Sequence, residues 1–129
     1  MKNKGFTLIE LLVTTTIILL LTSIAVVSYA SASKRSRDNK RISDLETLRS
    51  ALEIYRSEEG VYPLDLNSLA TTYINEIPTD PKPDNYSYYY SSDGSTYTLC
   101  AYIESDLANN GCGSSLCGDS VCTHRMSPP

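Results

Sequence analysis

Residues 6–59 contain neither proline nor glycine. Because these two residues most often end or bend a helix, nothing in this stretch demands a break. The chain also lacks a glycine-rich phosphate loop, an HExxH motif and a paired acid cluster in a buried pattern, and its one histidine is His124. Common catalytic sites need such groups at defined spacings. These absences predict a protein that is not an enzyme and uses no cofactor.

A long uncharged run follows Glu10. From Leu11 to Ala32 the chain contains no Asp, Glu, Lys or Arg. As an α-helix this run would extend about 33 Å, enough to cross a hydrocarbon core about 30 Å thick. No small-residue cleavage site follows the apolar run, so an ordinary secretory signal peptide fits poorly. We expect a helix that remains on the mature protein and anchors it in the membrane.

The segment before this run, residues 4–10 with the sequence KGFTLIE, resembles the prepilin signal of type IV pilins and type II secretion pseudopilins. The resemblance implies cleavage between Gly5 and Phe6 by a prepilin peptidase, followed by methylation of the Phe6 amine. It also implies that Glu10 pairs with the Phe6 ammonium of an adjacent subunit during assembly. Opposite charges in a low-dielectric layer offset each other's desolvation. The alternative for Glu10 is snorkelling, because it lies barely one turn from the mature N-terminus.

The helix is expected to continue beyond the membrane to a total of roughly 50 residues. Gly60 is a plausible C-cap, and Pro63 prevents the helix from resuming. Charged residues such as Arg41 are expected away from the apolar face of the second half. That face recurs at spacings of three and four residues and consists of Ile42, Leu45, Leu48, Leu52 and Tyr55. At two positions where pilins often carry a helix-loosening Gly and Pro, this chain has Leu19 and Val27.

After the helix we expect a short helix over 66–74, a proline-rich loop over 77–83 and then a β-hairpin. Its strands are predicted at 86–91 and 96–103 around a turn at 92–95. The more apolar face of the second strand should pack on the long helix, and the ten tyrosines are interpreted mainly as packing residues. The predicted fold class is α+β, a long N-terminal helix on a small antiparallel sheet, as the pilin resemblance also implies.

Four segments follow from this pattern. Residues 1–5 form a cleaved leader, 6–33 a transmembrane and assembly helix, and 34–60 its amphipathic continuation. Residues 61–129 form a globular head that ends in a cysteine-rich region.

All four cysteines lie at or after position 100. Outside the cytoplasm, such clustering predicts two disulfides in one of three possible connectivities. A zinc site with His124 is the alternative, but no close CxxC pair is present, and we predict no metal. The four cysteines predicted to form the disulfides are Cys100, Cys112, Cys117 and Cys122.

Charge is unevenly distributed. Residues 34–41 carry five basic groups and one acidic group, whereas residues 42–129 carry four basic and thirteen acidic groups, a net charge of −9. An acidic head argues against general nucleic-acid binding. The basic segment 34–41 either contacts headgroups and water or pairs with the acidic head of a neighbouring subunit; we favour the first. The positive-inside rule would place this segment in the cytoplasm, whereas the prepilin signal and the cysteines place it outside, and we follow the signal.

The region after the hairpin contains candidate calcium ligands. Their oxygens are of the kind that calcium takes, but their spacing matches no calcium loop that we can justify. The residues are Glu104, Asp106, Asn109 and Asn110.

The sequence favours a structural subunit of a type IV pilus-like filament for adhesion, motility or DNA uptake, a helical homo-polymer whose open, head-to-tail contacts make a fibre. By resemblance, its partners are the prepilin peptidase, the membrane and an inner-membrane assembly machinery with an ATPase. The head would lie outside the cytoplasm, in an extracellular or periplasmic filament after assembly. One alternative is a pseudopilin of a type II secretion system. A second is a membrane-tethered binding domain that does not polymerise.

Overall fold

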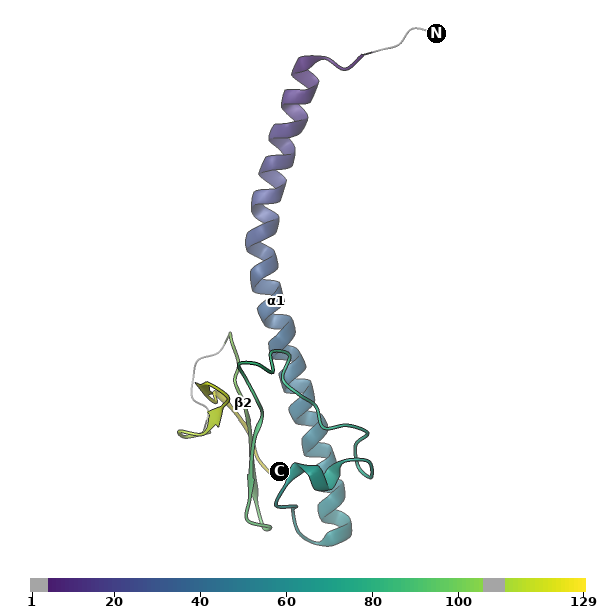
Figure 1. The fold of residues 1–129 in the computed structure, drawn as a ribbon, viewed down its shortest axis with the longest axis vertical. Helices are drawn as coiled ribbons and strands as arrows, with labels where there is room; N and C mark the ends of the chain where they lie inside the picture. Colours follow the sequence, from purple (N-terminus) through teal and green to yellow (C-terminus); the bar gives the residue numbers. More distant parts are fainter. Residues whose placement is uncertain (1–4, 106–110) are drawn as a thin grey trace. The chain divides into compact units, whose positions relative to one another are not determined.

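The structure, a computed structural model, describes residues 5–105 and 111–129 and divides into two compact units (Figure 1). The first unit is Met1–Lys34 and the second is Arg35–Pro129. The second unit contains the whole β structure of the described chain. The fold is the predicted α+β arrangement with one long N-terminal helix and a small antiparallel sheet.

Helix α1 runs from Leu8 to Glu59. It ends as predicted, because Gly60 adopts a φ of +79° and its N–H donates to the Arg56 carbonyl at 2.8 Å. Only glycine takes this left-handed conformation without strain. Among the described residues, α1 is the one helix that is long and apolar enough to cross a membrane, judged by length and composition. Its large apolar side chains in the first unit are exposed, among them Leu8 at 82% and Tyr29 at 76%.

The main sheet has the strand order β1-β2-β5, with both pairs antiparallel. Strand β1 is Tyr89–Ser92, β2 is Tyr97–Ala101 and β5 is His124–Met126. Two short strands, β3 (Leu116–Cys117) and β4 (Ser120–Val121), form a separate hairpin. The predicted hairpin between β1 and β2 is confirmed, with the Asp93 N–H donating to the Thr96 carbonyl across the turn.

The core of the second unit lies between α1 and β2, as the periodicity predicted. Leu45, Leu48 and Leu52 are fully buried there. They share one cluster with Leu99 and Ala101 of β2. The remaining buried members of that cluster are Ala51, Tyr62, Leu69, Tyr97 and Met126. Burying each large aliphatic side chain contributes about 1.5–3 kcal/mol, so this cluster fixes the helix against the sheet.

Two local predictions about the helices were wrong. Ile42, predicted on the core face, is 38% exposed, because it lies beyond the edge of the buried stripe. The helix expected over 66–74 is only a 3-10 turn, η1 (Leu66–Leu69), after which Ala70 and Ile74 form an isolated bridge. Leu69 is the one buried residue of that turn, so a longer helix here would bury little apolar surface.

The first strand begins three residues later than predicted. Tyr86 does not enter the sheet, because its ring stacks on that of Tyr102 at a centroid distance of 4.5 Å and the Arg41 guanidinium lies over it. Strand β5 was not predicted at all. Its three residues, His124–Met126, pair with β2, and so short a strand carries no usable alternation in the sequence.

Candidate functional site

The residues expected at the processing and assembly site lie in the first turn of α1 and directly before it. The side chain of Glu10 accepts hydrogen bonds from the Thr7 backbone N–H at 3.1 Å and from the Thr7 hydroxyl at 3.0 Å. In return the Glu10 N–H donates to the Thr7 hydroxyl oxygen at 3.3 Å. This reciprocal pair is a capping box, which satisfies backbone donors that the start of a helix leaves unpaired.

The capping box gives Glu10 a local role that the sequence interpretation missed. The detectable pattern was Thr-x-x-Glu directly before an apolar run. Gly5 and Phe6 precede this turn and are exposed. The predicted cleavage bond therefore lies in non-helical backbone shortly before the helix begins.

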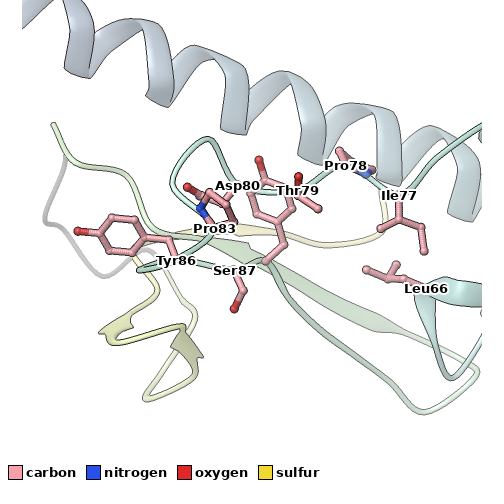
Figure 2. A pocket seen from close by; sticks show the side chains of 9 residues that line it. Leu66, Ile77, Pro78, Thr79, Asp80, Pro83, Tyr86 and Ser87 are labelled. Carbon is pink, nitrogen blue, oxygen red and sulfur yellow. The ribbon is translucent and has the colours of Figure 1, made fainter.

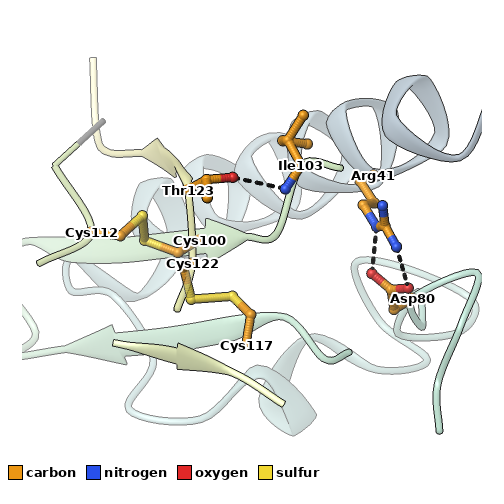
Figure 3. Close-up of a disulfide and its surroundings, with 8 residues drawn as sticks. All are labelled: Arg41, Asp80, Cys100, Ile103, Cys112, Cys117, Cys122 and Thr123. Atoms are coloured by element: carbon orange, nitrogen blue, oxygen red, sulfur yellow. Dashed lines mark hydrogen bonds and ion pairs between the residues drawn. A yellow bond between two sulfur atoms is a disulfide. The ribbon is translucent and has the colours of Figure 1, made fainter. Parts of the chain in front are cut away.

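A second cluster, of charged side chains, is buried in the head around Arg41. Its guanidinium is fully buried and forms two bonds to Asp80, Nε–Oδ2 at 2.7 Å and Nη2–Oδ1 at 3.0 Å (Figure 3). Nη1 also contacts Asp38 at 2.9 Å and Glu104 at 3.1 Å. One cation of α1 thus joins the proline-rich loop to the segment after β2.

Glu104 is held by two further cations. Arg37 contacts both of its carboxylate oxygens at 2.7 Å, and Lys82 lies at 3.5 Å. The hydrogen bond from Arg37 is the main reason that the pKa of Glu104 is lowered to about 2. The pKa of Asp38 is also lowered. Burial alone would raise it, but hydrogen bonds from the N–H groups of Ser105 and Glu104 and from Arg41 outweigh the effect of burial.

This cluster changes the interpretation of the basic segment 34–41. Arg41 was expected away from the buried face, yet it is buried, and both Arg37 and Arg41 bind carboxylates of their own head. Neither headgroup contact nor pairing with a neighbour accounts for these two residues. Charged side chains are buried when their partners neutralise and hydrogen-bond them, and here two of those partners, Asp80 and Glu104, are distant in sequence.

Glu104 is also unsuited to a calcium-binding role. Its carboxylate is occupied by Arg37, Arg41 and Lys82. The other three candidate ligands, Asp106, Asn109 and Asn110, lie outside the described residues. Within residues 5–105 and 111–129, no group of three or more His, Cys, Asp or Glu side chains could hold a metal ion.

The cysteines form two disulfides, Cys100–Cys112 and Cys117–Cys122 (Figure 3). No thiolate therefore remains for the alternative zinc site. The first disulfide ties β2 to the chain before β3. The second closes the β3–β4 hairpin, whose Gly118, at a φ of +76°, packs directly on the backbone of Asn85.

A hollow of about 230 Å³ lies between the proline-rich loop and the segment before β1 (Figure 2). Its wall is mainly apolar, and its one carboxylate, Asp80, is bound to Arg41. The described lining therefore offers no free carboxylate as a general acid or base. The lining residues are Leu66, Ile77, Pro78, Thr79, Asp80, Pro83, Tyr86, Ser87 and Tyr88.

Comparison with known proteins connects the N-terminal site to a family. Residues 1–26 match the model of the prokaryotic N-terminal methylation motif. The chain is 29% identical to the type II secretion system core protein G of Vibrio cholerae over 111 residues, covering 74% of this chain and 76% of that protein. It is 28% identical to the Escherichia coli core protein G over 134 residues, covering 85% and 92%.

A type IV pilin is also similar. The type IV major pilin protein of Myxococcus xanthus is 32% identical over 92 residues, which cover 70% of this chain and 38% of the pilin. No solved structure gave a significant match. The motif, the apolar helix and the pilin-like fold agree with both kinds of relative, and the chain is a homologue of the type II secretion major pseudopilins and the type IV pilins.

Proposed function

We propose that the chain is the major pseudopilin of a type II secretion system, a structural subunit that polymerises into a filament in the cell envelope. One observation carries this choice: the similarity to core protein G extends over up to 92% of that protein, whereas it covers 38% of the type IV pilin. The comparisons thus favour the alternative over the surface pilus that the sequence first suggested.

The N-terminal geometry supports the first step of this function. A prepilin peptidase would cleave between Gly5 and Phe6 and leave a methylated amine at Phe6. The bond lies in exposed, non-helical backbone, which a peptidase can reach without unwinding α1. The span after Glu10 would hold the subunit in the membrane, with the head outside the cytoplasm, where the two disulfides are stable.

Assembly would then move the span from lipid into a filament of like subunits. Its large apolar side chains are exposed in the single chain, so they need a partner or lipid. Glu10 would pair with the Phe6 ammonium of a neighbour, because a charge in this layer is costly unless it is matched. An ATPase-driven machinery would supply the work of extraction.

Deletion of the gene in the native host tests the proposal. We expect secreted proteins to accumulate inside the envelope while surface filaments and surface motility remain. Restoring the gene should restore secretion, and a gene encoding Gly5→Val should not, because its product stays unprocessed. Loss of surface filaments with unchanged secretion would instead identify a type IV pilin.

A further inference from the structure

The β3–β4 hairpin presents two apolar side chains to solvent. Leu116 is 60% exposed and Val121 is 44% exposed. They lie directly opposite each other in the hairpin, so both side chains project from the same face. We call these two residues the hairpin pair. Neither residue is a member of the two buried clusters of the head, so the pair contributes nothing to them, although its exposure to water is unfavourable.

The hairpin that carries the pair is held firmly in place. A lone two-stranded hairpin is marginally stable at best in water. Here the Cys117–Cys122 disulfide closes it, and the Asp119 N–H donates to the Asn85 carbonyl at 3.1 Å. Both cysteines cluster with Cys100 of β2, whose side chain alternates away from the α1 face of the sheet. The hairpin therefore lies beyond β2, away from α1 (Figure 1), and the hairpin pair keeps one orientation.

The hollow shown in Figure 2 is an apolar site of suitable size for such side chains. Leu66, Ile77 and Tyr88 of its lining pack against the core between α1 and β2. Its volume of about 230 Å³ exceeds the roughly 150 Å³ of a cavity that binds benzene, so it has room for an aliphatic side chain. The walls are fixed in advance, because Asp80 is bound to a buried cation of α1 and the Tyr88 hydroxyl donates to a carboxylate of α1 at 2.7 Å.

We infer that the hairpin pair of one subunit inserts into the hollow of the next subunit. This inference rests on the proposed filament, and it adds a contact between heads. The pair does not fill the hollow of its own chain, because Leu116 and Val121 are exposed. The contact joins two different surfaces, the hairpin and the hollow. Contacts of this kind form open fibres when successive rotations do not close a ring.

The size of the contact indicates a second copy as the partner. Two aliphatic side chains bury on the order of 100 Å² each, whereas a stable interface needs roughly 800 Å² on each partner. A free protein would not stay bound through so small a contact. Copies of this chain that are already anchored side by side meet at a high effective concentration, which allows the same contact to be occupied. The hairpin pair thus links heads inside an assembly, and isolated subunits remain separate.

Photo-cross-linking of filaments in the native host tests the contact. The photoreactive residue p-benzoylphenylalanine replaces Leu116. In the matched control it replaces Leu64, another exposed apolar residue of the head, at 77%. Position 116 should give a cross-linked dimer on denaturing electrophoresis, and mass spectrometry should map the cross-link to residue 66 or residues 77–88 of the second copy. Position 64 should give no cross-link to those residues.

Charge substitution gives a second measurement. Leu116→Glu with Val121→Glu would place two carboxylates in an apolar hollow, which is costly, so filament yield should fall at least about tenfold. Val61→Glu with Leu64→Glu is the matched control. It adds the same charge at apolar residues that are 51% and 77% exposed, and it should leave the yield within about twofold. Intact mass and the disulfide state show whether each variant is processed and folded; the cross-link, which introduces no charge, decides if one is not.

The outcomes separate this inference from the proposed function. If the unaltered chain forms no filament, the proposed function fails. If filaments form but position 116 cross-links to no second copy, to a different surface of it or to another protein, the inference is wrong and the filament function stands. Equal yields from the two double variants would also overturn the inference, because the hairpin pair would then matter no more than other exposed apolar residues.

Discussion

Replacing Arg41 by methionine should destabilise the head severely. Methionine keeps much of the side-chain volume but removes the cation that three carboxylates share. The side chains of Asp38 and Asp80 are only 5% and 1% exposed, so water cannot replace Arg41. Removing one partner of a buried ion pair costs about 3–5 kcal/mol, a large share of the roughly 5–15 kcal/mol that stabilises a typical domain.

The expected shift in melting temperature follows from the size of the head. For a domain of about 100 residues each kcal/mol shifts Tm by about 4–8 °C, so the variant should melt at least about 12 °C lower. The assay is thermal unfolding of the full-length chain in detergent micelles, followed by near-ultraviolet circular dichroism of its tyrosines with the disulfides intact.

Arg49→Met is the matched control. Arg49 lies on the same helix, but its side chain is 32% exposed and its nearest carboxylate, on Glu46, is 3.9 Å away. An ion pair of this kind is worth about 0–1 kcal/mol, so this variant should melt within about 8 °C of the unaltered chain. Equal melting temperatures for the two variants would refute the argument, because burial of the carboxylates would then not depend on Arg41. Adding Asp38→Asn and Asp80→Asn to Arg41→Met should recover part of the loss.

Four further results are expected. The head should lose stability as pH falls from about 4.5 towards 2. The pKa of Glu104 is lowered to about 2 in the folded chain, so its contribution to the free energy of unfolding is complete only above its unfolded pKa. Glu104→Gln should therefore flatten the pH dependence of stability measured by acid unfolding. The mature chain should begin at a methylated Phe6 by intact mass, and Gly5→Val should leave the full-length mass. Alkylation without reduction should label none of the four cysteines in exported protein; labelling of two would contradict the disulfides. Glu10→Ala and Glu10→Gln should both be processed and inserted yet form fewer filaments, and undiminished yield from both would favour snorkelling.

The sequence predicted those parts of the head that depend on apolar periodicity. Leu45, Leu48 and Leu52 recur at helical spacing, and burial of such a stripe is enforced by the hydrophobic effect whatever its partner. The long helix and its end were predictable for a similar reason, because Gly60 acts locally. Ile42 shows the limit of the method, since the width of a buried stripe depends on how far the partner sheet extends.

Arg41 could not be predicted, because its burial depends on residues far along the chain. Its partners Asp80 and Glu104 lie 39 and 63 positions away, and no local pattern marks them. The cysteine pairing is a similar case. Count and compartment predict two disulfides, but all three connectivities were open until β2 and the β3–β4 hairpin placed the sulfur atoms. Tyr86 failed as a strand residue because stacking on Tyr102, a non-local contact, replaced sheet pairing.

We propose that the Glu10 side chain serves both the single subunit and the filament. In the single chain its carboxylate accepts two hydrogen bonds from Thr7 and closes the first turn of α1. A carboxylate has room for more donors than these, so the ammonium of a neighbouring Phe6 need not displace them. The capping box would then hold the carboxylate in place before the neighbour arrives, which reduces the entropy lost on pairing. Alanine at Glu10 removes both roles, whereas glutamine retains an oxygen that can accept from Thr7 and removes only the charge. Filament loss in the glutamine variant therefore reports on the charge pair, and any additional loss in the alanine variant reports on the start of the helix.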